Sequence, residues 1–190
     1  PLIYENNKYS SFNSLDLCLG KNGEIIKNIK TKKKNIIPSG DFCVEAVSAT
    51  TMLLKKSVIT EIGGWDENLY TYLEDLDLCL KLRRNNYQLI KIKNSIVHHV
   101  GFGSHKNENI GKFELSRNWH FMWSSLYFKE KYENKSEFIY YFFRNLIKYF
   151  FKTIIFTLIF NKKKTILNFM RFRACINYLI IKKSNFRIYF

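Results

Sequence analysis

The sequence has few cysteines, and they lie far apart. Cys18, Cys43, Cys79 and Cys175 form no Cys-x-x-Cys pair, so neither a zinc knuckle nor a disulfide framework is predicted. Reduced thiols in a cytoplasmic setting fit this pattern. A charged-then-apolar leader of the signal-peptide kind is also missing, and the chain begins with Pro1 rather than Met. We interpret the chain as a piece of a longer protein or as a processed one.

Acidic residues are scarce toward the C-terminus. Residues 129–190 hold 14 Lys and Arg against 3 Asp and Glu, net +11, whereas residues 1–128 hold 17 against 13, net +4. A basic C-terminal third predicts an anionic partner, either nucleic acid or a membrane surface.

The same third has no long uncharged apolar run. Its longest candidate, residues 153–161, has nine residues, whereas a membrane span needs roughly 20. Before it, Arg144, Lys148 and Lys152 stand at i, i+4 and i+8 on a predicted aromatic helix over residues 138–152. We therefore expect this segment to lie in the membrane interface rather than to cross the bilayer.

A second amphipathic helix is predicted for residues 165–181, which contain Arg171 and Arg173. The three lysines at 162–164 precede it and are placed to meet anionic headgroups. The alternative is a helical pair packed on the rest of the protein, and both interpretations can hold together.

Acidic residues are instead concentrated in residues 63–82. Glu74, Asp75 and Asp77 open a predicted helix, where negative charge meets the positive end of the helix dipole. Asp77 and Lys81 are spaced i,i+4, and a solvent-exposed ion pair is the favoured interpretation of Asp77. Asp75 lies off that side of the helix and has no comparable local partner. It is the stronger candidate for chemistry.

Turn residues delimit the neighbouring elements. A short helix is predicted from the N-cap candidate Ser57 to Gly63, and Asn86 is expected to end the acidic helix in a left-handed conformation. Short strands are predicted within residues 1–40, 42–54, 89–93 and 95–100.

His98 ends the last of these predicted strands. A helix of about eleven residues rises about 16 Å, and the extended chain that follows can return a similar distance. His98 can thus come back to the end of the helix where Asp75 lies. A metal-ligand role and a packed or surface histidine are both consistent with this position.

Several short motifs occur in an order and spacing that resemble a known family. They are the small-residue run 48–54, Gly63-Gly64-Trp65-Asp66-Glu67, Glu74-Asp75-Leu76-Asp77, Asn86-Tyr87, Val97-His98 with Gly103-Ser104, and Ser116-Arg117-Asn118. The chain resembles the C-terminal half of the catalytic domain of family 2 glycosyltransferases, which are inverting enzymes of the GT-A fold, and especially the rhamnosyltransferase-like members. The fold expected from this resemblance is α/β, a partial GT-A domain over residues 1–128 followed by basic amphipathic helices over residues 129–190.

The resemblance also implies roles for individual residues. Asp75 would be the catalytic base with Glu74 beside it, and His98 would help to hold a divalent cation, Mg or Mn. Substrate-binding roles would fall to Trp65, Asp66, Tyr72, Asp77 and Arg117. Trp65 and Tyr72 are each expected either to stack on a sugar or acceptor or to pack in the core.

The sequence also departs from the family pattern. The nucleotide-binding half and its Asp-x-Asp metal motif would lie upstream, and residues 1–42 do not supply them. Asn86 and Lys81 replace the family's usual Gly and Arg. The Gln-x-x-Arg-Trp pattern of processive synthases is missing, which favours transfer of one sugar per event.

We therefore expect a sugar-nucleotide-dependent glycosyltransferase that acts in surface polysaccharide synthesis on a lipid-linked or saccharide acceptor. Its expected location is peripheral, at the cytoplasmic face of an anionic membrane. The rivals are a non-catalytic basic module that binds membrane or nucleic acid, and an inactive fragment that lacks the donor-binding half. Nucleic acid is disfavoured because the basic residues alternate with aromatic-aliphatic runs at helical spacing, whereas single-strand binding would call for stacking platforms on a sheet.

Overall fold

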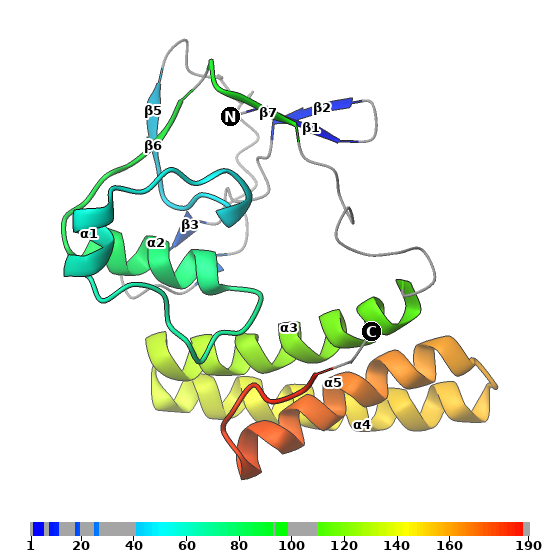
Figure 1. Ribbon diagram of the computed structural model, residues 1–190. Coiled ribbons are helices and arrows are strands. Elements are labelled where there is room, and N and C mark those ends of the chain that lie inside the picture. Colours follow the sequence, from blue (N-terminus) through cyan, green and yellow to red (C-terminus); the bar gives the residue numbers. More distant parts are fainter. Residues whose placement is uncertain are drawn as a thin grey trace. The chain divides into compact units, whose positions relative to one another are not determined.

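The computed structural model describes residues 2–5, 8–11, 18–19, 25–26, 41–92, 94–98 and 110–187. These residues form a mixed α/β structure in which helix predominates (Figure 1). The chain divides into two compact units. Unit 1 comprises Pro1–Asp66 and Glu74–Gly103, and unit 2 comprises Glu67–Leu73 and Ser104–Phe190.

The strands of unit 1 are short and form three small sheets. β1 (Leu2–Glu5) pairs antiparallel with β2 (Lys8–Ser11) and parallel with β7 (Ile96–His98), with Tyr4 opposite His98. β3 (Cys18–Leu19) pairs with β4 (Ile25–Ile26), and β5 (Phe42–Val44) pairs with β6 (Leu89–Lys91), both antiparallel. Strands are thus present in each region where they are predicted.

Helix α1 (Lys56–Glu61) ends as the double glycine predicts. Gly63 has a φ of +76°, its N–H donates to Thr60 O at 3.3 Å, and Gly64 N–H donates to Ile59 O at 2.9 Å. This pair of bonds is a Schellman motif, which satisfies carbonyls at the helix end. The N-cap prediction is wrong, because the cap position is Lys55 and Ser57 already lies in the first turn.

Helix α2 (Glu74–Arg84) forms the centre of the unit's core. Leu76, Leu78, Leu80 and Leu82 are buried, and Cys79 is buried with its Sγ 3.6 Å from Val47 O. Asn86 ends the helix at a φ of +63°, and Tyr87 N–H donates to Leu82 O at 2.9 Å. The predicted end of this helix is confirmed.

Unit 2 is built on three helices that lie side by side: α3 (Ile110–Tyr132), α4 (Lys135–Leu158) and α5 (Lys162–Ile180) (Figure 1). Their core joins aromatic and sulfur-containing side chains from all three helices. The fully or nearly fully buried members are Trp119, Met122, Trp123, Leu126, Phe142, Tyr149, Met170, Ala174, Cys175 and Tyr178.

The two predicted C-terminal helices are present as α4 and α5. Sequence analysis did not predict α3, and the expected domain boundary between residues 128 and 129 falls inside this helix. Within the described ranges, no helix combines the length and apolar character that crossing a bilayer requires.

Candidate functional site

The candidate site in unit 1 is the N-terminal end of α2. Glu74 and Asp75 occupy the first two positions of the helix, and both are half-buried. The two residues before them, Tyr72 and Leu73, have φ values of +65° and +68°. Left-handed backbone at two successive bulky residues is uncommon and strained. The surrounding structure must therefore stabilise the backbone conformation of these two residues before α2.

The Asp75 carboxylate contacts two backbone N–H groups. Leu76 N–H donates to Oδ1 at 2.9 Å, and Ala49 N–H donates to Oδ2 at 3.4 Å. Ala49 begins the 3-10 turn Ala49–Thr51, which lies in the small-residue run of the sequence. Asp75 therefore links this turn to the start of α2 through backbone N–H groups. The bond to Ala49 is long, which leaves Oδ2 with capacity for another donor.

Glu74 is the carboxyl group whose pKa is raised at this end of the helix. Burial is the main cause, its own backbone N–H opposes the effect, and the neighbouring charge of Asp75 adds to it. Its Oε2 atom is buried and makes no hydrogen bond to the described residues. A buried carboxyl oxygen with a raised pKa is a functional-site signal that the sequence does not reveal.

Asp77 pairs with Lys81 but is not solvent-exposed as expected. The Lys81 Nζ atom lies 3.7 Å from Asp77 Oδ2, and the Asp77 side chain is 1% exposed. Lys81 also donates a hydrogen bond to Gly64 O at 3.0 Å, and this bond joins α2 to the double-glycine turn. The Asp77 carboxylate is covered in this structure, and its role in substrate binding stays a prediction.

Trp65 and Asp66 follow the double glycine in unit 1. Trp65 is 40% exposed, and Asp66 is half-buried. An exposed tryptophan ring in a loop is free to stack on an apolar face of a ligand.

Tyr72 and Arg117 belong to unit 2. The Tyr72 ring meets Phe121 edge-on at 5.9 Å, and Ser124 Oγ donates to the neighbouring Thr71 O at 2.8 Å. This favours the packing interpretation of Tyr72. Arg117 is exposed on α3. The predicted substrate-binding residues are thus divided between the two units.

The predicted metal site is not formed by the described side chains. The backbone of His98 ends β7, but its side chain lies outside the described part, as do His99 and His105. Among the side chains that are described, no group of three His, Cys, Asp or Glu is placed to hold an ion. The divalent cation and the role of His98 stay predictions.

His120 is buried in unit 2 and was not among the residues predicted from the sequence. Its Nε2–H donates to Phe186 O at 2.9 Å, and its Nδ1 lies 3.0 Å from Ser184 Oγ. Burial lowers its pKa to about 4, and the bond to Phe186 opposes this effect while Arg187 adds to it. Neutral His120 fastens the residues after α5 to α3, and only their separation of more than 60 residues hid this from the sequence.

The outer face of α4 carries two kinds of exposed side chain. One set is basic, and Arg144, Lys148 and Lys152 line up on one side as predicted. The other set is apolar and includes Ile139, Tyr140, Phe143, Ile147, Phe150, Phe151, Ile154 and Leu158. α4 therefore packs on α3 and α5 with one face and leaves aromatic and basic side chains in solvent with the others. The structure is therefore consistent with both interpretations of this segment, packing within the protein and contact with a membrane interface.

Fold and site together define a mixed α/β protein with a carboxylate pair at the start of a buried helix and a basic, aromatic three-helix unit. Comparisons with protein-family models, with curated proteins and with solved structures found no match for this chain.

Proposed function

We propose that this chain is the C-terminal, acceptor-side portion of an inverting glycosyltransferase with a GT-A fold. The observation that carries the proposal is the half-buried pair Glu74 and Asp75 at the start of α2. The motif order from residue 48 to residue 118 supports it. The enzyme would move one sugar from a nucleotide-sugar donor to a lipid-linked or saccharide acceptor during surface polysaccharide synthesis.

Asp75 is the general base in this proposal. An acceptor hydroxyl becomes a sufficient nucleophile when a carboxylate within hydrogen-bond reach takes its proton as it attacks the anomeric carbon. The contacts of Asp75 with Leu76 and Ala49 restrict the position of the carboxylate, which supports this role because a general base must be held in a defined orientation.

A divalent cation would neutralise the departing nucleoside diphosphate. The described carboxylates do not form a three-ligand site for it. In this proposal its main ligands come from a donor-binding segment upstream, with His98 as an additional ligand.

The three-helix unit would hold the enzyme at the cytoplasmic face of the membrane. Exposed aromatic side chains of α4 insert into the interface, while Arg144, Lys148 and Lys152 face anionic headgroups. A lipid-linked acceptor is then available at the same surface.

The test is the Asp75→Asn variant of the natural protein. Turnover should fall roughly 10²–10⁴-fold with little change in donor binding, because the amide keeps the shape but does not accept the proton. Glu67→Gln, which also neutralises an exposed acid close to α2 in sequence, is the control and should keep normal turnover. Near-normal turnover of Asp75→Asn would contradict the assignment.

A non-catalytic membrane-binding module is the second candidate. The exposed apolar and basic face of α4 favours it, since that face does not depend on the carboxylates. The natural protein would be screened for sugar transfer with a range of donors and acceptors and for binding to vesicles. Vesicle binding without sugar transfer would favour this candidate.

A further inference from the structure

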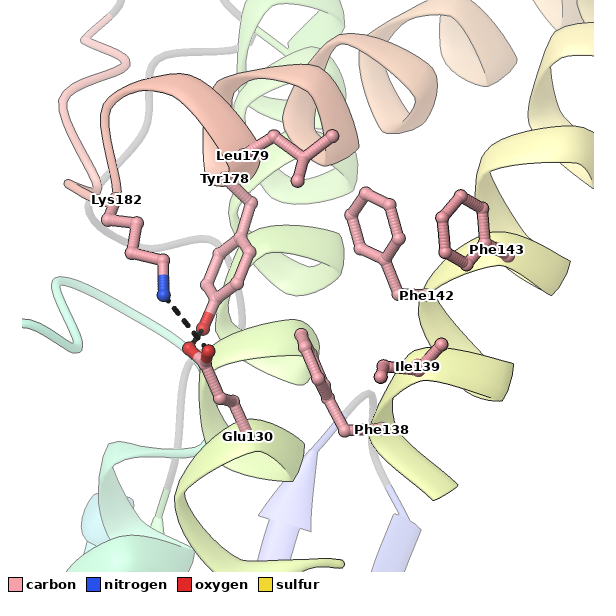
Figure 2. A pocket seen from close by; sticks show the side chains of 8 residues that line it. All are labelled: Glu130, Phe138, Ile139, Phe142, Phe143, Tyr178, Leu179 and Lys182. Atoms are coloured by element: carbon pink, nitrogen blue, oxygen red, sulfur yellow. Dashed lines mark hydrogen bonds and ion pairs between the residues drawn. The ribbon is translucent and has the colours of Figure 1, made fainter. Parts of the chain in front are cut away.

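A groove between α4 and α5 contains a cavity of about 160 Å³. Figure 2 shows its lining, in which Phe138, Ile139, Phe142 and Phe143 of α4 lie across from Tyr178 and Leu179 of α5. The walls are thus built from apolar and aromatic side chains.

Polar groups at one end of the cavity satisfy one another. Glu130 of α3 accepts hydrogen bonds from the Tyr178 hydroxyl and from Lys182 Nζ, the latter at 3.0 Å. Burial opposes ionisation of Glu130, but these two bonds outweigh it and lower its pKa. Each carboxylate oxygen already accepts one hydrogen bond and the other lining side chains are mostly apolar, so a polyol entering the cavity would replace few of its bonds to water. The lining therefore selects a hydrocarbon.

The mouth of the cavity is apolar too. Ile139 and Leu179 are 42% and 56% exposed, and the exposed face of α4 continues from them toward Phe150. Lys182 lies beside Glu130 at the polar end of the cavity (Figure 2), and its side chain is 62% exposed, which leaves its ammonium open to a further anion. Glu130 is the carboxylate in the lining, whereas residues 138–190 contain no Asp or Glu and 11 Lys and Arg, so the charge along this stretch of the chain favours an anionic head group.

We propose that this groove binds the hydrocarbon chain of an anionic lipid, with Lys182 beside the phosphate. An apolar cavity of about 150 Å³ holds one benzene molecule, so the groove accepts a chain segment of about six carbons. The remaining chain would lie on the exposed face of α4. A second copy of this protein fits less well, because it would bring an equally basic surface.

Octyl phosphate, kept below its micelle-forming concentration, is the probe, and calorimetric titration of the full chain measures its affinity. Ile139→Trp fills the groove and should weaken binding at least tenfold. Ile147→Trp is the matched control, because Ile147 is also exposed on α4 but does not line the cavity, and its affinity should be unchanged. Equal melting temperatures establish that both variants are folded. No binding to the unmodified chain, or equal loss in both variants, would overturn the site.

The head group and chain type are tested separately. Lys182→Gln should weaken octyl phosphate binding about fivefold while octanol binding stays the same, and equal losses for both probes would remove Lys182 from the site. Competition by farnesyl phosphate or by lysophosphatidylglycerol distinguishes a prenyl from an acyl chain, and failure of both to compete would refute a lipid ligand. Asp75→Asn should leave octyl phosphate binding intact, so this site and the proposed reaction are tested independently.

Discussion

His120 is the residue whose environment makes the clearest prediction about pH. Its folded-state pKa of about 4 lies below its ordinary value of 6.5, so the unfolded chain binds the proton first as the pH falls. The stability that neutral His120 provides is complete above pH 6.5 and is lost between pH 6.5 and pH 4. The loss can reach about 3 kcal/mol, at 1.36 kcal/mol for each pKa unit.

Urea unfolding followed by tryptophan fluorescence at pH 6.5 and pH 4.5 measures this effect. His120→Gln should retain a hydrogen bond but remove the titration, so its stability should change less between the two pH values than that of the unmodified chain. An identical pH dependence in both proteins would show that other groups cause it.

Gly63 and Gly111 provide a matched pair for backbone conformation. A Cβ at either position meets nothing within 4 Å, but Gly63 has a φ of +76° whereas Gly111 lies in α3. Gly63→Ala should therefore destabilise the protein by about 1 kcal/mol, and Gly111→Ala should stabilise it by up to about 1 kcal/mol. Thermal unfolding of the two variants checks the opposite signs, and a neutral Gly63→Ala would contradict the left-handed turn.

At the scale of the element, the proposed membrane binding by α4 cannot be tested by truncating the chain. Removing the chain after Lys135 would take away α4 and α5, and it would uncover Trp119 and Trp123 on α3. Loss of membrane binding would then be confused with loss of the core. Substitutions on the exposed face avoid this problem.

The double variant Lys148→Gln with Lys152→Gln removes two exposed charges from α4. Each basic residue near an anionic surface contributes about 1 kcal/mol, so affinity for phosphatidylglycerol vesicles should fall about 30-fold. Lys55→Gln with Lys56→Gln removes the same charge from exposed positions in unit 1 and should have a much smaller effect. Equal effects of the two pairs, measured by vesicle sedimentation, would show that net charge alone drives binding.

The helices differ in how far the sequence predicts them. Helices α1, α2, α4 and α5 are predicted by signals that lie within a few residues of one another. Gly63 and Asn86 mark the ends of α1 and α2, and the spacing of basic and apolar residues indicates α4 and α5. Helix α3 has no such stripe, because its buried residues at 119, 120, 122–126, 128 and 132 surround much of the helix. A helix that is buried on most sides has no amphipathic period.

At the scale of the whole molecule, the candidate sites depend on contacts that local patterns do not contain. The exposure of Asp77 was wrongly predicted because the Lys81 bond to Gly64 is a tertiary contact. Glu130 and Tyr178 are 48 positions apart, and nothing in either neighbourhood pairs them. The sequence could therefore predict the carboxylates at the start of α2 and the basic aromatic helices, but not the groove.

The division of the chain between the units has a consequence for synthesis on the ribosome. Residues 67–73 belong to unit 2, and Thr71 accepts its hydrogen bond from Ser124, which is made 53 residues later. At 5–20 residues per second, this segment waits about 3 to 10 seconds for its partner. During that interval residues 74–103 of unit 1 are made, so residues 67–73 first lie between the two parts of unit 1 and acquire their final neighbours only when α3 emerges.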